Sequence, residues 1–186
     1  MLLLVGLGNP TPDSENNRHN IGFKMIDAIN QKFSLSKQKP KFKGLLTTGN
    51  IDEKKIYAIK PLTFMNNSGI CIREIIEYFK IEPENIIVFH DDLDIDFGKI
   101  KAKFGGSSAG HNGIESIDKF IGKEYSRVRI GIGKLKMKTN VSDHVLKDFD
   151  DDEILQLNEI TNNIIHSISI LIDKKLDLFS STVNNK

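Results

Sequence analysis

The chain has 186 residues, 39% of them hydrophobic and 27% charged, with a formal net charge of +1. These values are typical of a globular protein, and we expect one domain over residues 1–186. No apolar run is long enough to cross a membrane. The apolar segment Met1–Val5 lacks a basic flank and ends at Gly6, which indicates a buried strand rather than a signal peptide.

The single cysteine, Cys71, excludes an intramolecular disulfide framework. Together with the missing export signal, it favours a cytoplasmic protein. Cys71 lies within an apolar helical pattern, so we expect it to pack in the core rather than act as a nucleophile.

The charge is distributed unevenly along the chain. Residues 99–147 carry 11 Lys/Arg and 4 Asp/Glu, whereas residues 148–186 carry 3 and 8. The basic block is a candidate phosphate-binding surface, although a solvated lysine face explains the same count. The acidic cluster from Asp148 to Glu153 predicts the start of a helix, where carboxylates face the positive end of the helix dipole.

Short apolar runs alternate with amphipathic segments, which predicts an α/β fold with a mixed sheet covered by helices. Helices are predicted over about 21–33, 72–79 and 151–173, with another that begins near Asn112. We expect a mobile surface loop over 34–43 and a frayed polar tail over 180–186. The predicted strands cover about 2–6, 45–51, 55–60, 86–90, 99–104 and 127–132.

A glycine-rich turn follows the first predicted strand. Gly6-Leu7-Gly8 is similar to the start of a dinucleotide-binding fingerprint, but Thr11 stands at the third glycine position and Pro10 interrupts the loop. A nicotinamide cofactor is therefore not expected. The turn either has only a structural role or presents Asn9 to a site.

No metal site is predicted. Asp92, Asp94 and Asp96 have the first spacings of a calcium loop, but Phe97 and Lys103 occupy its glycine and glutamate positions. The five histidines show no zinc spacing, and a lone cysteine cannot complete a zinc site. A Gly-x-Ser-x-Gly elbow is also absent from the sequence, so serine nucleophilic catalysis has no support.

His19 is the candidate base. It stands just before a predicted helix, where an imidazole can remain accessible, and imidazole titrates near ~6.5 in model peptides. Asp91, at the end of a predicted strand, either hydrogen-bonds His19 and fixes its tautomer or pairs with a lysine. Asn66 and Asn112 either cap the helices that they precede or hold a carbonyl substrate. This set predicts water activation by histidine.

These segments, in this order and spacing, resemble bacterial peptidyl-tRNA hydrolases, which cleave the ester between a peptide and its tRNA. The resemblance covers the chain from Leu3 to about Phe149. It implies a single-domain, three-layer α/β/α fold with a twisted mixed β-sheet flanked by helices. The matching segments are Val5-Gly6-Leu7-Gly8-Asn9-Pro10, Arg18-His19-Asn20-Ile21-Gly22, Lys60–Gly69, His90-Asp91-Asp92-Leu93-Asp94, Gly110-His111-Asn112-Gly113 and Arg127–Gly133.

The resemblance implies a role for individual residues at the ester. His19 would be the base that activates water, and Asp91 its orienting partner. Asn9 and Asn66 would position the substrate near the ester. Neither a cofactor nor a metal is implied.

Further residues are implied in substrate binding. Phe64 and Met65 would line the groove on the peptide side. His111 and Asn112 would lie on a neighbouring loop, with Asn112 contacting the terminal nucleotide or its bound water.

The expected partner is the peptidyl-tRNA itself. Lys103 and Arg129 match positions that meet tRNA phosphates, and both lie within the basic block. Ser14 stands where the family usually has a tyrosine, which removes a contact near the tRNA end. The run before His111, residues 105–110, contains fewer glycines than is usual, which affects that loop's expected mobility.

Two alternatives remain from the sequence. One is an RNA-binding relative that keeps the fold without hydrolysis, as occurs among plastid splicing factors similar to this family; the intact polar set argues against it. The other is hydrolysis of a different acyl ester, which needs no RNA surface. The dispersed apolar pattern favours a monomer, and recycling of tRNA from prematurely released peptidyl-tRNA is the expected role.

Overall fold

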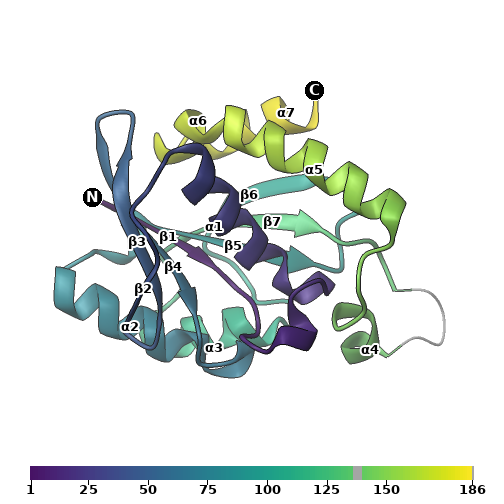
Figure 1. Ribbon diagram of the computed structural model, residues 1–186, viewed down its shortest axis with the longest axis horizontal. Helices are drawn as coiled ribbons and strands as arrows, with labels where there is room; N and C mark the ends of the chain where they lie inside the picture. Colours follow the sequence, from purple (N-terminus) through teal and green to yellow (C-terminus); the bar gives the residue numbers. More distant parts are fainter. Residues whose placement is uncertain (136–139, 186) are drawn as a thin grey trace.

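The computed structural model describes residues 1–135 and 140–185. Lys136 and Lys138 of the basic block, and Lys186 of the tail, lie outside these residues. Seven strands form one mixed sheet in the order β2-β3-β4-β1-β5-β7-β6 (Figure 1). The strands are β1 (Leu2–Gly6), β2 (Lys39–Lys41), β3 (Gly44–Ile51), β4 (Lys54–Pro61), β5 (Ile86–Asp92), β6 (Ile100–Phe104) and β7 (Ser126–Gly131).

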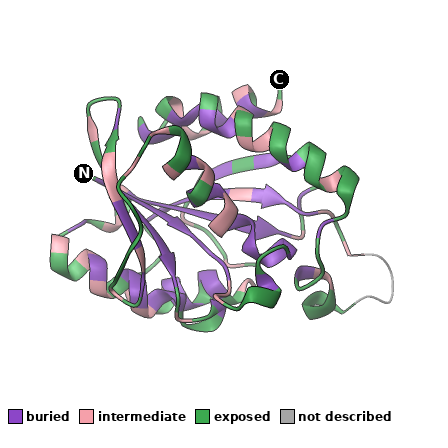
Figure 2. Ribbon diagram, in the orientation of Figure 1, coloured by how far each residue is buried: buried purple, intermediate pink, exposed green. Residues whose placement is uncertain are grey.

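The centre of the sheet is parallel. Strands β4, β1, β5 and β7 run in the same direction, whereas β2, β3 and β6 extend the sheet through antiparallel pairs. Residues Leu2–Gly6 and Ile86–Asp92 are buried throughout, as expected for strands covered on both faces (Figure 2). The carboxyl ends of these central strands meet at one edge of the sheet, and the loops that follow them carry the candidate residues.

Helices cover both faces of the sheet, which confirms the predicted three-layer arrangement (Figure 1). Helices α1, α5, α6 and α7 contribute to one hydrophobic cluster, and α2 and α3 contribute to the other. Short 3-10 turns cover Pro12–Ser14, Arg18–Asn20, Met65–Asn67 and Pro83–Asn85. The helices are α1 (Ile21–Lys32), α2 (Ser68–Phe79), α3 (Asn112–Ile121), α4 (Val141–Val145), α5 (Asp151–His166), α6 (Ile168–Ile172) and α7 (Leu176–Asn184).

The acidic cluster opens helix α5, as predicted. The Asp150 carboxylate accepts the backbone N–H of Glu153, and the Glu153 carboxylate accepts the backbone N–H of Asp150, each at 2.9 Å. The predicted single helix over 151–173 is wrong, because the chain breaks at the buried Ser167 into α5 and α6.

The expectation of a frayed tail is wrong for residues 180–185. Helix α7 continues to Asn184, with Phe179 and Val183 buried against the sheet. The Asn184 side chain accepts the Ile100 N–H at 3.0 Å and donates to the Ile100 carbonyl at 2.7 Å. Two residues further along β6, the backbone N–H of Ala102 donates to the Ser180 hydroxyl at 2.8 Å. The tail is ordered because it supplies hydrogen bonds that edge strand β6 lacks.

The expected loop over residues 34–43 contains strand β2. Residues Lys39–Lys41 pair antiparallel with β3. All three side chains are exposed, so no apolar alternation marks the strand in the sequence (Figure 2). Cys71 packs in the core as predicted, and burial raises the pKa of its thiol to about 12. None of the described helices is long and apolar enough to span a membrane.

Candidate active site

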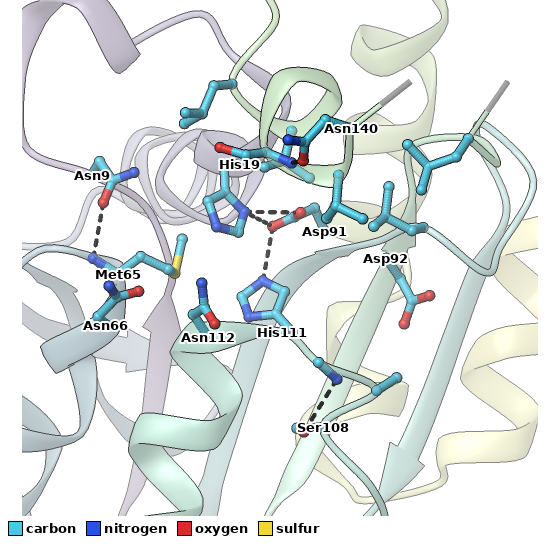
Figure 3. A pocket seen from close by; sticks show the side chains of 18 of the residues that line it. Asn9, His19, Met65, Asn66, Asp91, Asp92, Ser108, His111, Asn112 and Asn140 are labelled. Carbon is cyan, nitrogen blue, oxygen red and sulfur yellow. Dashed lines mark hydrogen bonds and ion pairs between the residues drawn. The ribbon is translucent and has the colours of Figure 1, made fainter. Parts of the chain in front are cut away.

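A pocket of about 1140 Å³ opens at the carboxyl edge of the central strands (Figure 3). Its walls come from the loop after β1, the turns at Arg18–Asn20 and Met65–Asn67, the end of β5, the loop before α3, and helix α4. Two of the predicted residues, Lys103 and Arg129, are not among its lining residues. Those that line it are Asn9, Ser14, His19, Phe64, Met65, Asn66, Asp91, His111 and Asn112.

The turn that carries His19 is fixed by its neighbour Arg18. The buried Arg18 guanidinium donates to both carboxylate oxygens of Glu153, at 2.8 and 2.6 Å, and to the carbonyl of Lys147 at 3.1 Å. These charge-assisted hydrogen bonds from both terminal nitrogens of Arg18 hold the turn against the segment that leads into α5. His19 is therefore presented to the pocket from a rigid segment.

Asp91 lies between two histidines. Nδ1 of His19 is 2.9 Å from both carboxylate oxygens of Asp91, and Nε2 of His111 is 3.0 Å from Oδ1 (Figure 3). Burial raises the pKa of Asp91, but its attraction to His111 and His19 outweighs burial, so the pKa lies well below its usual value. An ionised carboxylate only accepts hydrogen bonds, so both ring nitrogens that face it carry hydrogen.

The proton on Nδ1 of His19 leaves Nε2 as the free ring nitrogen. This atom makes no hydrogen bond to any residue within 1–135 or 140–185, and the ring lines the pocket. In Figure 3 the ring points toward the space between Met65, Asn112 and His111. The geometry suits a general base whose second nitrogen is held by a carboxylate.

The opposite wall of the pocket is built from neutral amides. The side chain of Asn20 accepts the Asn9 N–H and donates to the Asn9 carbonyl, each at 2.9 Å. Asn9 Oδ1 in turn accepts the backbone N–H of Met65 at 2.9 Å. Because Oδ1 is occupied, the NH₂ group of Asn9 is the end available to a substrate oxygen. Asn20 has no role in the sequence analysis, although it stands beside His19 in the motif.

Asn66 and Asn112 do not cap the helices that follow them. Asn66 lies in the Met65–Asn67 turn, and Asn112 is the first residue of α3, whose cap is His111. Nδ1 of His111 accepts the N–H groups of Gly113 at 3.1 Å and Ile114 at 3.3 Å. Both asparagine side chains are exposed and make no hydrogen bond to any described residue. The capping alternative is therefore wrong, and contact with a substrate stays a prediction.

Phe64 stands at the rim of the pocket in a strained conformation. Its φ of 60° and ψ of 160° are unusual for a residue with a side chain, and the residue is 53% exposed. The strained backbone brings the aromatic ring to the pocket, beside Met65.

The chain is similar in sequence and in fold to proteins of one known family. The sequence model of the family described as "Peptidyl-tRNA hydrolase" matches residues 3–186. Similar relatives include peptidyl-tRNA hydrolases of Pelagibacter ubique, 82% identical over the whole of both chains, and of Ehrlichia canis, 44% identical over 98% of this chain and 94% of the relative. The crystal structure of the Acinetobacter baumannii peptidyl-tRNA hydrolase is 34% identical, with a TM-score of 0.92 over 99% of this chain and 94% of that one. This chain belongs to the peptidyl-tRNA hydrolase family.

His90 has no role in the sequence analysis, although it precedes Asp91. Its Nδ1 lies 2.7 Å from the Asp91 carbonyl, and its ring meets the His111 ring edge to face at 4.8 Å. Burial lowers the pKa of His90 to about 3. In this member of the peptidyl-tRNA hydrolase family, His90 is therefore neutral packing behind the site.

The two cationic residues that the resemblance assigns to tRNA phosphates lie on the β6–β7 side of the sheet. Lys103 is exposed on β6, and Arg129 on β7 donates through Nε to Asp92 Oδ2 at 2.7 Å. Part of the Arg129 charge is therefore neutralised within the protein. The register pairs Lys103 with Arg127 and Lys101 with Arg129, so basic residues are adjacent across these strands.

Several pocket residues were not found from the sequence. Helix α4 contributes an apolar wall through Val141, Val145 and Leu146, and Asn140 caps that helix through the Ser142 N–H at 3.0 Å. No motif marks this segment. Ser14, which the resemblance places where the family usually has a tyrosine, pairs its hydroxyl with that of Thr11 at 2.8 Å, and both residues line the pocket.

The only grouping of potential metal ligands among the described residues is His19, Asp91 and His111. Their ligand atoms lie within 4.8 Å of one another. A metal requires an unprotonated nitrogen, but Nδ1 of His111 accepts two backbone N–H groups, which places the hydrogen on Nε2. The donor set is therefore arranged to share protons rather than to hold a cation.

Proposed function

We propose that His19 activates the water that cleaves the ester bond of peptidyl-tRNA. Family membership gives the reaction itself: the protein is a hydrolase that acts on peptidyl-tRNA. The observation that supports His19 as the base is the contact between its Nδ1 and the buried Asp91 carboxylate, which leaves Nε2 facing the pocket.

In the proposed reaction, Nε2 of His19 takes a proton as water attacks the ester carbonyl. Asp91 stabilises the imidazolium that forms. When the carbon–oxygen bond to the tRNA breaks, the imidazolium returns the proton to the leaving 3′ oxygen. The peptide leaves as a carboxylic acid, which loses its remaining proton to water. This sequence needs neither a cofactor nor a metal, and it forms no covalent intermediate.

We propose that the amides across the pocket stabilise the negative charge that develops on the carbonyl oxygen. Asn9 offers its NH₂ group, and the side chain of Asn66 makes no hydrogen bond to any residue that the structure describes. A positioned donor of this kind contributes roughly 3 to 4 kcal/mol to stabilisation of the transition state.

Selection for blocked amines follows from the same wall. The groups on the proposed peptide side, Asn9, Phe64, Met65 and Asn66, carry no charge. A free ammonium placed there lacks a counter-ion, and burying an unpaired charge is costly. We therefore assign the peptide to the Phe64 and Met65 side.

We place the tRNA on the opposite side, toward Lys103 and Arg129. The exposed Lys101 and Lys103 of β6, with the partly exposed Arg129 of β7, support phosphate contacts that weaken with salt. Asn112, which lines the pocket between the two sides, is assigned to the terminal nucleotide. We further propose that the protein acts as a monomer in the cytoplasm and recycles tRNA from prematurely released peptidyl-tRNA.

The test is release of N-acetyl-aminoacyl groups from tRNA, measured beside the unblocked aminoacyl-tRNA. We expect cleavage of the blocked ester alone. His19→Ala is expected to lower kcat by about 10²- to 10⁴-fold, the usual contribution of a general base. His166→Ala, which changes an exposed histidine of α5, is the matched control and should keep full activity.

Two outcomes would contradict the proposal. Binding of tRNA without cleavage of either ester would indicate an RNA-binding relative, whereas an unchanged rate for His19→Ala would remove its role as the base. Activity that is insensitive to salt and to removal of the tRNA body would favour hydrolysis of another acyl ester.

A further inference from the structure

Both ring nitrogens of His111 are occupied by protein groups. Nδ1 accepts the N–H groups of Gly113 and Ile114 at the start of α3, at 3.1 and 3.3 Å. Nε2 donates to Asp91 Oδ1 at 3.0 Å, and the His111 side chain is only 10% exposed. The ring is thus a neutral bridge between the first turn of α3 and the carboxylate that holds His19.

These contacts leave His111 no free polar atom for a substrate. They also leave it unable to accept a proton without losing the helix cap, because a nitrogen that takes up hydrogen cannot accept the two N–H groups. The resemblance had placed His111 among the substrate-binding residues, and the hydrogen bonds point to a different role.

We propose that His111 is a positioning residue that locks Asp91 in place by capping α3 through Nδ1 and donating from Nε2 to Asp91 Oδ1. The inference rests on the proposed role of His19 as the base. Through this bridge, the rigid helix α3 fixes the orientation of Asp91, and Asp91 fixes the tautomer of His19.

The packing around the ring supports a fixed position. The rings of His90 and His111 meet edge to face at 4.8 Å, and the rings of His19 and His111 are 4.9 Å apart with a tilt of 49°. The backbone of Asp91 is also held, since its carbonyl lies 2.7 Å from Nδ1 of His90. Rotation of His111 would break the cap, the Asp91 contact and this packing together.

The bridge also adjusts how strongly Asp91 attracts a proton on His19. A carboxylate that accepts a second hydrogen bond is a weaker acceptor for the first. Without His111, Asp91 would stabilise the imidazolium of His19 more strongly, and the base would be protonated at a higher pH. Loss of the bridge is therefore expected to move the acid limb of the pH–rate profile upward.

Other charged groups near the site do not replace this bridge. Asp92 at the end of β5 is paired with Arg129 of β7, and Arg18, beside His19, is turned to Glu153 of α5. From the remaining elements around the pocket, Asp94 follows β5 and Lys134 precedes α4, and both are exposed at the rim. The buried His90 is the remaining titratable group packed against His111.

The first experiment measures the tautomer of His111 directly, by ¹⁵N–¹H correlation spectra of the histidine rings in the complete protein. We expect hydrogen on Nε2 alone across the pH range of activity. Hydrogen on Nδ1 would overturn the inference. This result does not depend on any substrate, so it is separate from a failure of the proposed function, which would show as absent hydrolysis by the unaltered protein.

The second experiment compares His111→Asn with His111→Ala. The shorter asparagine side chain can cap α3 but cannot reach Asp91, whereas alanine removes both contacts. We expect both variants to lower kcat about tenfold, with KM within twofold, and to move the acid limb upward by up to about one pH unit. Only His111→Ala should also lower the melting temperature.

Each other outcome decides against the inference. A raised KM with unchanged kcat would make His111 a substrate contact. Unchanged kinetics and an unchanged acid limb in His111→Asn would show that the bridge to Asp91 has no part in catalysis. His166→Ala, on the exposed face of α5, serves again as the control for changing a histidine.

Discussion

The two walls of the pocket hold their functional groups by different means. The histidine wall (His19, Asp91 and His111, backed by His90) is built around a buried negative charge and depends on where protons lie. The asparagine wall (Asn9, Asn20, Met65 and Asn66) is held by neutral amide and backbone hydrogen bonds. One wall therefore responds to pH, and the other does not.

The difference separates two tasks. A base must exchange a proton with water, so its surroundings must respond to charge. A group that bears a developing oxyanion works best when it is fixed before the reaction and has no proton to lose. Substitutions in the two walls should therefore lower activity by different amounts and change its pH dependence differently.

The largest effect is expected from Asp91→Asn. An amide carries no negative charge, and because Nδ1 of His19 lies 2.9 Å from both oxygens of Asp91, the NH₂ group of asparagine would face Nδ1 in either orientation and donate to it. His19 is then drawn into the wrong tautomer, and kcat should fall about 10³- to 10⁴-fold. Hydrolysis of N-acetyl-aminoacyl-tRNA measures this loss. As a control, Asp94→Asn at the exposed rim should keep kcat within threefold of the unaltered protein. A loss below tenfold for Asp91→Asn would contradict the role given to the histidine wall.

The second effect concerns stability in acid. The folded state holds His90 neutral down to a pKa of about 3, whereas in the unfolded chain it takes up a proton below its ordinary pKa of 6.5. The free energy of unfolding should therefore fall as the pH drops from 6.5, by about 1 kcal/mol per pH unit from this residue. Asp91 contributes in the same direction only near and below its ordinary pKa of 3.8.

Urea unfolding at several values between pH 7 and pH 4.5 measures this slope. His90→Phe keeps a ring against His111 but cannot titrate, so its stability should depend less on pH. His166→Gln, at an exposed position, should keep the original slope. Equal slopes for His90→Phe and the unaltered protein would show that His90 is not held neutral.

The asparagine wall should show a smaller loss. Asn9→Ala removes the acceptor for the Met65 N–H and the donor assigned to the carbonyl oxygen, which is worth roughly 3 to 4 kcal/mol in the transition state. We expect kcat/KM to fall about 10²- to 10³-fold, with the shape of the pH–rate profile unchanged. Asn16→Ala, which removes an exposed contact to Lys24, is the matched control. A shifted pH profile in Asn9→Ala would mean that the two walls are coupled.

The smallest effect lies outside both walls. Lys103→Ala should raise KM about two- to fivefold at low salt and reduce the slope of log KM against log salt by about one, because one phosphate contact is lost. Lys39→Ala, on strand β2 at the other edge of the sheet, should change neither. A change in kcat for Lys103→Ala would place this residue nearer to the chemistry than we propose.

Much of the sheet could be predicted because its central strands β1 and β5 are buried on both faces and β6 begins with alternating buried and exposed residues. The six predicted strands agree with the structure to within about two residues at each end. Strand β2 could not be predicted, since Lys39–Lys41 has only exposed residues and is defined by its partner. The end of α7 was not predicted because most of its residues are polar. The helical spacing of Leu176, Phe179 and Val183 is the signal that indicates it.

Only part of the site could be predicted, because some of its contacts depend on how distant segments of the chain meet. The contact between His19 and Asp91 was proposed from the ends of two elements, and the structure contains it. The contact of His111 with Asp91 depends on how the loop before α3 returns to β5, which no local pattern specifies. The cap of α3 is His111 rather than Asn112, because the loop directs the imidazole and not the amide at the free N–H groups.

Helix α7 has a consequence for a shortened chain. The pocket is lined by residues up to Leu146, so a protein that ends before Leu176 keeps every group assigned to the reaction. It would nevertheless uncover Ile100 and Ala102 on β6, whose N–H groups are satisfied by Asn184 and Ser180. An open strand of this kind pairs readily with a second copy. The nine residues of α7 thus protect the molecule from self-association, and a catalytically complete fragment would be lost to aggregation.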